Sequence, residues 1–462
     1  MTPDNNLSLL WYVIGYGVII TVMGLWYSRK ITTSEDFVLA GKTLGPIVLT
    51  GTLLATFSGS GTITGGSNAI AYAYGFWPAI YVVILPGVIG MGILLAIAPK
   101  IRGHGQYTVA RILESQFGTP ARRIANVIII LAYVGIVSYQ FKGIGFVLNV
   151  TTGVSVETGT AIGAVLIVVL AAAGGLMAVA PTDALSAFLM IIGLALAIPA
   201  VLDSAGGLTA MVQALPAGHL SAMGHLSPVQ ILGYTIPFLF LLMGDQNIYQ
   251  RLAASSGDKA ARGGIVGWLM GAAFVFTAVS CIATTARALF PHIDPGMALI
   301  ATTRILPTFL GGILLAAAAA FIVTTGNSYL LSAATSVAYD VYAAHIKPDA
   351  SEEDLLWVTK LCIPLLGLAA WVLLAFFPSV LQIQMLAYVI YSAGVTPAVL
   401  SVFLWKGVTR AGGIASMVTG VVATTAWEVV KPYDVVSSVV AVPLAIVVLI
   451  AVSKWTTAYK ED

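Results

Sequence analysis

Charged residues are scarce in this chain of 462 residues. Asp, Glu, Lys and Arg together supply 9% of it, whereas hydrophobic residues supply 59%. A soluble domain carries about a quarter charged residues, so this composition excludes an ordinary soluble protein. Long apolar runs cross a bilayer as helices. The composition therefore predicts an all-α integral membrane protein that passes through the cell membrane many times.

Other features that carry chemistry are also missing. The two cysteines, Cys281 and Cys362, both fall in apolar segments, which excludes a disulfide framework and a cysteine metal site. The basic residues are scattered over short loops, so we expect no nucleic-acid partner. The sequence contains no Ser-His-Asp arrangement, no paired catalytic acids, no phosphate loop and no HExxH motif. We therefore expect a protein that is not an enzyme.

The chain is rich in apolar segments of the length that a bilayer requires, about 20 residues. Two boundaries are weakly marked: only a short link at 180–183 separates the fifth segment from the sixth, and the seventh segment is short and is expected to extend toward Gln250. We count thirteen segments, at residues 9–28, 44–73, 76–98, 124–150, 158–180, 183–202, 228–243, 263–289, 309–342, 355–377, 380–405, 412–430 and 435–452.

The distribution of Lys and Arg orients these segments. With the N-terminus outside, 17 of the 21 basic residues fall in inside loops, Arg251 among them, and Lys142 lies within a segment. The other 3, in outside loops, are Arg287, Arg304 and Lys431. Cytoplasmic loops carry an excess of Lys and Arg. We therefore predict that the N-terminus lies outside and the C-terminus inside, which requires an odd number of spans.

The second segment is interrupted where a spanning helix should be most apolar. Residues 53–66 read LLATFSGSGTITGG. In hydrocarbon every backbone N–H and C=O needs a partner, so a cluster of Gly, Ser and Thr at mid-depth indicates a helix that opens onto a cavity. An opened helix presents carbonyl groups at one broken end and amides at the other. These ends suit a cation and an anionic or polar solute.

A second interruption lies five segments later, where the seventh segment carries Pro237 and then Gly244. A five-helix unit that is repeated once gives two copies of opposite orientation. Broken helices at matching positions of two such halves mark the central site of a transporter. The alternative is that Gly and Pro are simply common in membrane helices. Because both breaks are in register, we favour the transporter.

The ninth segment places hydroxyl groups in the middle of a span. Thr324 and Thr325 are adjacent, Asn327 and Ser328 follow within one turn, and Ser332 follows one turn later. Hard cations prefer oxygen ligands, and neutral hydroxyls with exposed carbonyls suit a monovalent ion such as Na⁺. Hydrogen bonding between helices, worth about 0.6–2 kcal/mol, is the alternative. Together with the opened second segment, the hydroxyls lead us to favour an ion site.

Four ionisable side chains stand in or beside these segments. Asp183 begins the sixth segment, where it either caps the helix or serves as a second cation ligand or proton-relay carboxylate. Asp245 and Asp340 are expected to make surface or gate contacts at inner ends. Lys142 either reaches the outer interface or supplies a counter-charge for a carboxylate solute.

Between the third and fourth segments, apolar residues recur near one helical face. This spacing predicts a short amphipathic helix on the cytoplasmic surface, which either covers the bundle or takes part in gating. The residues are Tyr107, Val109, Ile112, Leu113 and Phe117.

Several stretches in order resemble the sodium:solute symporter family, whose members are sodium-coupled transporters of sugars, proline, pantothenate, sialic acid and monocarboxylates. The resemblance covers residues 36–405. The stretches are DFVLAGKTLGP, ATFSGSGTITGGSNAIAYAYGF, GQYTVARILESQFG, GGLMAVAPTDALSAF, GDQNIYQRLAA and TTGNSYLLSAATSVAYDVY.

The resemblance implies a LeuT-type fold, with one extra helix before a five-plus-five inverted repeat and two after it. The whole of 1–462 would be a single transmembrane domain. Its implied parts are a leading helix and loop at 1–43, a first repeat at 44–202, a second repeat at 228–405 and two C-terminal helices at 406–462.

The resemblance also implies where sodium binds. One site lies between the opened second segment and the ninth, and some family members have a second site that uses an acid. For the first site the implied carbonyls are those of Thr56, Gly59 and Phe321 and the implied hydroxyls are those of Thr324 and Thr325. For the second site the implied ligands are Asp183, Thr324 and Ser328.

The implied solute site lies beside the break. Sugar-transporting relatives have polar side chains where this chain has an apolar wall, and buried hydrogen-bonding groups are what select a polyol. This wall, with helix-end amides near Ser60 and Gly61 and with Lys142 as the candidate counter-charge, favours a small carboxylate with an apolar body. The residues beside the break are Ser58, Ser60, Thr62 and Ile63, facing Phe238 and Leu241, and the apolar replacements are Phe238, Ile63, Val82 and Ala272.

We therefore predict a sodium-coupled secondary active symporter that imports a small organic solute by alternating access. Its coupling ion is Na⁺, and its partners are sodium ions, the solute and the lipid bilayer, with the number of sodium ions and the oligomeric state left open. A proton-coupled transporter of the same fold and a membrane sensor or binding module are the alternatives.

Overall fold

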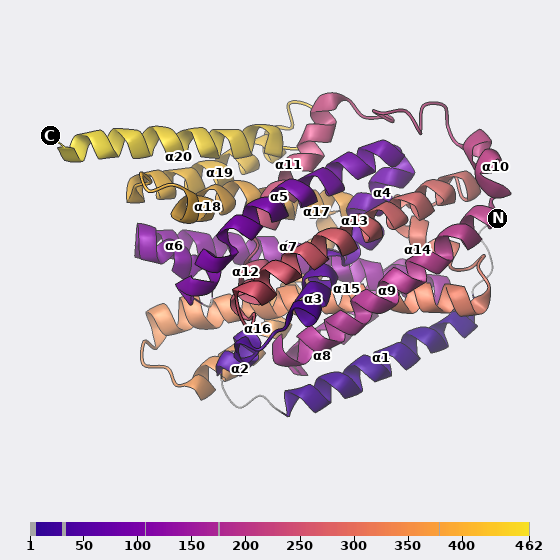
Figure 1. The fold of residues 1–462 in the computed structure, drawn as a ribbon, viewed down its shortest axis with the longest axis horizontal. Coiled ribbons are helices and arrows are strands. Elements are labelled where there is room, and N and C mark those ends of the chain that lie inside the picture. Colours follow the sequence, from indigo (N-terminus) through magenta and orange to yellow (C-terminus); the bar gives the residue numbers. More distant parts are fainter. Residues whose placement is uncertain (1–5, 30–33, 107, 174–175, 378, 462) are drawn as a thin grey trace.

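The computed structural model describes residues 6–29, 34–106, 108–173, 176–377 and 379–461. These residues form long helices that lie roughly side by side, with α1 on one side of the bundle and α20 on the opposite side (Figure 1). The N-terminal and C-terminal ends of the chain lie at opposite ends of the bundle. This arrangement agrees with the all-α membrane protein that the composition predicts.

Eleven helices among the described residues are long and apolar enough to cross a membrane. Several of them consist of two consecutive helical pieces. They are α1 (Leu7–Ser28), α5 (Phe76–His104), α7 (Thr119–Thr152), α9 (Leu176–Ser204), α11 with α12 (Pro228–Gly244 and Gln246–Ala253), α13 (Asp258–Leu289), α15 with η4 (Thr308–Ser336 and Val337–Ile346), α16 with η5 (Glu352–Leu373 and Leu374–Phe376), α17 with α18 (Val380–Gly394 and Thr396–Leu404), α19 (Arg410–Val430) and α20 (Ser438–Glu461).

A bent pair of helices adds a twelfth candidate span. The shorter apolar helix α8 (Val156–Ala173) would bring the total to the expected thirteen, and both that count and the orientation stay predictions. The remaining helices are short: α2 (Ser34–Leu39), η1 (Ala40–Lys42), α6 (Val109–Phe117), α10 (Gly207–Ala214), η3 (Pro295–Met297) and α14 (Ala298–Thr302).

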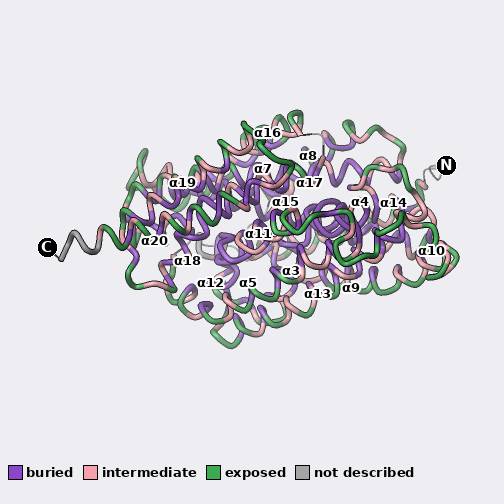
Figure 2. Tube along the Cα trace, turned by 90° about the horizontal axis from the view of Figure 1, so that it is seen from above, coloured by how far each residue is buried: buried purple, intermediate pink, exposed green. Residues whose placement is uncertain are grey.

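The predicted break in the second segment is confirmed. Helix α3 (Pro46–Phe57) ends before Ser58 and Gly59, which are not helical, and the chain continues as η2 (Gly61–Gly65) and α4 (Gly66–Ala73) with a bend of 56°. Nearly every residue of this stretch is buried, and Figure 2 shows the buried part of the chain concentrated around α3, α4 and α15. The interrupted helix is therefore at the centre of the protein, enclosed by α5, α9 and α13.

The seventh segment is also broken, as its Pro237 and Gly244 predict. Helix α11 ends at Gly244, Asp245 adopts an extended conformation, and α12 continues to Ala253. The expected extension toward Gln250 is confirmed. The Asp245 side chain accepts from the backbone N–H of Asn247 at 2.7 Å, so a carboxylate caps the start of α12.

The prediction of a link between two segments at 180–183 is wrong. Helix α9 already begins at Leu176 and runs through Pro181, Thr182 and Asp183. Proline is tolerated inside membrane helices because neighbouring groups satisfy the backbone. The adjacent Thr182 hydroxyl donates to the carbonyl of Val179 at 2.8 Å, within the same helix. Asp183 therefore points into the bundle from within a helix and does not cap one.

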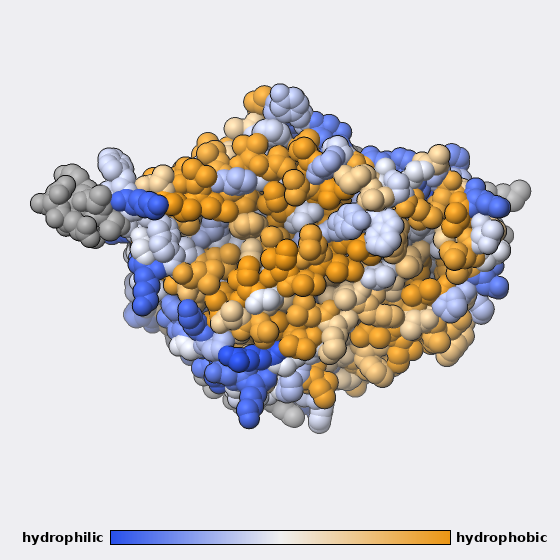
Figure 3. Space-filling view, turned by 45° about the horizontal axis from the view of Figure 1, so that its top comes forward, coloured by the Kyte–Doolittle hydropathy of each residue, from blue (hydrophilic) through white to orange (hydrophobic). Residues whose placement is uncertain are grey.

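The outer surface of the bundle suits a bilayer. Figure 3 shows hydrophobic side chains across the middle of the molecule and hydrophilic ones toward its two ends. The predicted amphipathic helix is confirmed as α6, whose Val109, Ile112, Leu113 and Phe117 are buried against α7 and α18. Tyr107 lies outside the described residues.

Candidate ion and solute site

Two glutamine side chains form hydrogen bonds with backbone groups at the break in the second span. Gln140 on α7 accepts a hydrogen bond of 2.8 Å from the backbone N–H of Ser60. Gln384 on α17 bridges the π-helical turn: its Nε2 donates to the Gly61 carbonyl at 3.0 Å, and its Oε1 accepts from the Gly66 N–H at 3.0 Å. Both glutamines are fully buried. The opened backbone is thus held by side-chain amides from two other helices.

Sequence reasoning missed these glutamines. Gln140 lies in the stretch VSYQFKG and Gln384 in the stretch LQIQMLAY, both within predicted spans. A buried amide in a membrane span needs a partner, so a glutamine within a span was the available signal.

Aromatic residues surround the same turn. A Cβ atom on Gly61 would lie 2.9 Å from Gln384 Nε2, 3.0 Å from the Tyr388 hydroxyl and 3.3 Å from the Tyr139 hydroxyl. The Phe238 ring on α11 meets the Tyr388 ring edge to face, with centroids 5.1 Å apart. The structure therefore brings the predicted Gly61 and Phe238 together, and adds Tyr139 and Tyr388.

The other predicted solute residues are dispersed around this centre. The Ser60 hydroxyl lies 2.6 Å from the Thr64 hydroxyl and against Gly143 of α7. The Ser58 hydroxyl is buried and has no hydrogen-bond partner within the described parts of the chain. Thr62, Ile63 and Leu241 are also buried.

Lys142 is half-buried on α7. Its ammonium group lies over the Phe146 ring, 5.9 Å from the ring centroid. Phe146 is one turn farther along α7, toward the predicted outer end. The suggested role of Lys142 as a counter-charge stays a prediction.

The predicted sodium residues lie where the broken span meets α15. The Thr325 hydroxyl donates to the carbonyl of Ala55 at 2.7 Å, one residue before the expected Thr56. A Cβ on Gly59 would lie 2.3 Å from Thr325 Oγ1, so only glycine permits this contact. The Thr324 hydroxyl donates to the Phe321 carbonyl at 3.3 Å. Hydroxyl and carbonyl oxygens from two helices therefore gather at one place, which suits a hard monovalent cation.

Asp183 forms a buried ion pair with Arg251 of α12. Arg251 Nη2 lies 3.5 Å from Asp183 Oδ2 and donates to Ser328 Oγ at 2.8 Å. The Thr52 hydroxyl donates to Asp183 Oδ2 at 2.6 Å and accepts from Arg251 Nε at 2.9 Å. The exposed fractions of Asp183 and Arg251 are 0% and 1%. The expected placement of Arg251 in an inside loop is therefore wrong, because α12 carries it into the bundle.

Asp245 is also buried, so a surface contact for it is wrong. The Tyr133 hydroxyl donates to its Oδ1 at 2.7 Å, and the Tyr329 hydroxyl donates to its Oδ2. These bonds join the break in the seventh span to α7 and α15.

Asp340, on η4, is the third buried carboxylate, and a surface contact is wrong for it as well. Its Oδ1 lies 3.1 Å from Arg122 Nε and 3.8 Å from Arg111 Nε, and it accepts from the Thr108 hydroxyl at 3.2 Å. Arg122 also pairs with Glu114 of α6 at 2.8 Å. The amphipathic helix is therefore fastened to the end of the ninth segment by charge as well as by apolar packing.

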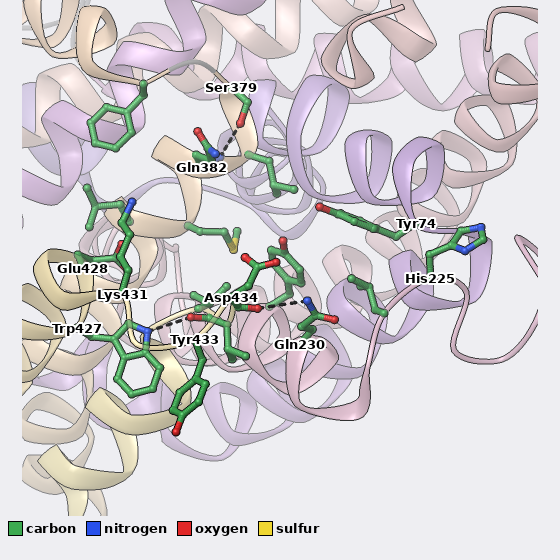
Figure 4. Close-up of a pocket in the computed structure, with 18 of the residues that line it drawn as sticks. Tyr74, His225, Gln230, Ser379, Gln382, Trp427, Glu428, Lys431, Tyr433 and Asp434 are labelled. Carbon is green, nitrogen blue, oxygen red and sulfur yellow. Dashed lines mark hydrogen bonds between the residues drawn. The ribbon is translucent and has the colours of Figure 1, made fainter. Parts of the chain in front are cut away.

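A cavity of about 700 Å³ lies between the start of α11, the start of α17 and the end of α19 (Figure 4). Tyr74, Gln230, Gln382, Lys431 and Asp434 are among the residues that line it. On the predicted orientation this is the outer end of the bundle. Its lining includes Tyr234, one helical turn from Phe238, so the cavity lies on the outer side of the aromatic cluster.

Known proteins resemble this chain over most of its length. The model of the sodium:solute symporter family matches residues 37–420. The sodium/pantothenate symporter of Escherichia coli (strain K12) is 26% identical, with 90% of this chain and 89% of that protein covered. The sodium/proline symporter of Haemophilus influenzae (strain ATCC 51907 / DSM 11121 / KW20 / Rd) is 26% identical, with 92% and 88% covered. The high affinity choline transporter 1 of Homo sapiens is 22% identical, with 88% and 74% covered.

Solved structures agree with the fold. A Na⁺-coupled sialic acid symporter in a substrate-bound outward-open state superposes with a TM-score of 0.82 at 18% identity, over 98% of both chains. The inward-facing structure of Mhp1 superposes with a TM-score of 0.61 at 12% identity, over 90% of this chain and 92% of that chain. The predicted LeuT-type fold is confirmed.

Proposed function

Because this chain belongs to the sodium:solute symporter family, we propose that the solute it carries with Na⁺ is a small carboxylate with an apolar body. Na⁺-coupled symport across the cell membrane is the activity of the family, and an enzymatic activity is not. The proposal concerns the solute and the residues that bind it.

The observation that carries the proposal is the pair of glutamine-bound amides at the break. The N–H groups of Ser60 and Gly66 are buried donors that each hold an amide oxygen. A carboxylate oxygen is a stronger acceptor than an amide oxygen, and helix-end N–H groups favour an anion. A solute carboxylate that replaced the oxygen of Gln384 would accept from the Gly66 N–H.

The walls of the region support an apolar body. Phe238, Ile63, Val82 and Ala272 are all buried, and each contributes only carbon atoms to its side chain. The solutes named for two of the relatives, pantothenate and proline, carry a carboxylate group. The solute named for a third relative, choline, is a cation. The choline transporter makes a quaternary ammonium solute the competing candidate.

Coupling follows from the position of the sodium residues. The Thr324 and Thr325 hydroxyls on α15 and the carbonyls of the broken span would hold Na⁺ between the two helices, adjacent to the solute region. Thr56 Oγ1 is a further buried oxygen with no partner among the described residues. A cation that joins the helices completes the solute region, so each ligand raises the affinity for the other. The membrane potential adds about 2.3 kcal/mol per charge per 100 mV.

Uptake in proteoliposomes tests the solute class. We expect an inward Na⁺ gradient to drive accumulation of labelled small carboxylates such as proline, and a K⁺ gradient of equal size to drive none. Competition by sugars or by choline with none by carboxylates would contradict the proposal. A protein that binds the solute without accumulating it would instead be a binding module.

Paired variants test the role of Gln384. The Gln384→Ala variant should lose most uptake, since the Gly61 carbonyl and Gly66 amide lose their partner. Gln382 lies two residues earlier, is exposed, and lines the outer cavity, so Gln382→Ala should retain most uptake. An equal loss of uptake in the two variants would indicate that the solute is not bound at the break in the second span.

A further inference from the structure

The ion pair between Asp183 and Arg251 stands where the resemblance implies a second sodium ion. That site would use the Asp183 carboxylate and the Ser328 hydroxyl. In the structure both groups contact one nitrogen of the Arg251 guanidinium, Nη2, at 3.5 Å from Asp183 Oδ2 and 2.8 Å from Ser328 Oγ. We propose that the guanidinium of Arg251 is a built-in cation at this place, so that the protein couples transport to one sodium ion.

The bonding around Arg251 supports a fixed position for its charge. Its Nε donates to the Thr52 hydroxyl at 2.9 Å, and its Nη1 donates to the Asn247 carbonyl at 3.4 Å. All three nitrogens of the guanidinium are therefore bonded, to groups on α3, α9, α12 and α15. The side chain is 2% exposed, so water does not screen its charge as it would at a surface.

The charge of Asp183 also argues against a second sodium ion at this place. Asp183 is completely buried, and a buried carboxylate needs a cation or several hydrogen bonds. Arg251 supplies the positive charge, and Thr52 supplies a further hydrogen bond to the same oxygen, Oδ2. A sodium ion here would approach a carboxylate that is already neutralised, and would meet a like charge at close range in a medium of low dielectric constant.

On the side of Arg251 and Ser328, the available space also disfavours a second ion. The cavity that borders Arg251 and Ser328 has a volume of about 10 Å³, roughly that of one water molecule. Asp183 Oδ1 accepts no hydrogen bond from the described residues, so one carboxylate oxygen is left over. A single free oxygen beside a fixed guanidinium does not provide the several oxygen ligands that a hard cation takes.

In a transport cycle a sodium ion leaves with the solute, whereas Arg251 stays attached to α12, the second helix of the broken seventh span. The charge that holds α3, α9 and α15 together here is therefore carried by a helix of the protein and not by a transported ion. The protein would then move one sodium ion per cycle.

Sodium titration of thermal stability tests this without knowledge of the solute. Purified protein is titrated with NaCl at constant ionic strength, with N-methyl-D-glucamine chloride as the balancing salt. The slope of the stabilisation free energy against the logarithm of sodium concentration reports how many ions bind. For the natural sequence we expect the slope that corresponds to one bound sodium ion. A slope of two would overturn the inference.

Variants separate the two sites. Arg251→Gln leaves the Asp183 carboxylate without its cation, so the slope should rise to two ions. The neutral pair Asp183→Asn with Arg251→Gln should return it to one, and this pair remains informative if the single variant fails to fold. A folded Arg251→Gln variant with a slope of one, or a neutral pair whose slope is lower than that of the natural sequence, would overturn the inference.

The inference rests on the sodium coupling of the family and on the first sodium site near Thr325. A slope of zero in the natural sequence would contradict that coupling as well as the built-in cation. A slope of two would contradict only the built-in cation. The proposed carboxylate solute is unaffected by either result, because no solute is present.

Discussion

The hydroxyl of Thr325 donates a hydrogen bond of 2.7 Å to the carbonyl oxygen of Ala55, which joins α15 to α3, the first helix of the broken span. The two residues are 270 positions apart in the chain. The carbonyl is one that the interruption at 58–60 leaves without its usual helical partner, since no regular α-helical turn follows. A cation placed here would be shared between the two helices.

Replacing this hydroxyl should remove the response to sodium. A ligand at 100 times its dissociation constant stabilises the folded state by about 2.7 kcal/mol. For Thr325→Ala we expect this extra stabilisation in NaCl, relative to KCl, to disappear. Melting temperatures in the two salts measure this. Thr424→Ala on α19 is the control, because Thr424 is equally buried and bonds only to Gly420 of its own helix. A Thr325→Ala variant that melts earlier by the same amount in both salts would indicate a packing role.

A methyl group at the π-helical turn should impair solute binding. Gly61→Ala places a carbon about 3 Å from Gln384 Nε2 and from the Tyr388 hydroxyl, so these side chains must shift. We expect a loss of stability of about 1–3 kcal/mol from overpacking and a larger solute concentration for half-maximal uptake.

Gly92 on α5 provides the matched control for that change. A Cβ there meets nothing within 4 Å, so Gly92→Ala should be neutral or stabilising by up to about 1 kcal/mol. Unaltered uptake in Gly61→Ala would show that the turn does not face the solute.

The buried carboxylate of Asp340 should contribute strongly to stability. Asp340→Asn removes one of the two carboxylates that pair with Arg122, which is 8% exposed, and leaves only the pair with Glu114 of α6. Breaking a buried pair by removal of one partner costs about 3–5 kcal/mol, and chemical or thermal unfolding measures it. Asp354→Asn breaks the exposed pair with Lys347 and should change stability little. Comparable effects of the two substitutions would contradict the assigned importance of the buried pair.

The loop at residues 215–227 should loosen in acid through His219. Its Nε2 donates to the Ala71 carbonyl at 2.9 Å, and burial lowers the pKa of its imidazole from 6.5 to about 4. The unfolded chain therefore binds a proton between pH 6.5 and 4 that the folded loop does not. Stability contributed by His219 is complete above about pH 6.5 and falls as the pH approaches 4.

Hydrogen exchange of residues 215–227 at pH 7.5 and pH 5 measures this effect. We expect faster exchange at pH 5, and a smaller difference in His219→Gln, whose side chain does not titrate. His292→Gln changes an exposed histidine in another loop and should leave the difference as it is. The same pH dependence in His219→Gln would assign it to another group.

Composition and spacing alone predicted the spans and their two breaks, whereas the LeuT-type fold was implied by the resemblance to the sodium:solute symporter family. Apolar runs of about 20 residues give spans, and the Gly, Ser and Thr cluster at 58–66 and the Pro237 and Gly244 pair give breaks, because each is a local effect of backbone chemistry in hydrocarbon. Local patterns also located the hydroxyls of Thr324 and Thr325 in mid-span.

Local reasoning failed where a side chain meets a partner from another helix. Pro181 looks like a helix start, yet α9 passes through it because the surrounding bundle accommodates the missing amide. Arg251 looks like a loop residue, yet α12 carries it to Asp183. The neighbouring residues in the sequence predict neither the path of α9 nor the burial of Arg251, because both depend on which helix packs against that position.

The sequence by itself determined that this protein is a helical membrane protein with two interrupted spans and with hydroxyl side chains in mid-span. Only the tertiary structure decided which groups satisfy the interruptions: Gln140 and Gln384 hold the opened backbone, and Arg251 neutralises Asp183. The physical reason is that a buried amide, carboxylate or guanidinium must be paired within the protein, and in a bundle the partner comes from a helix that is distant in sequence.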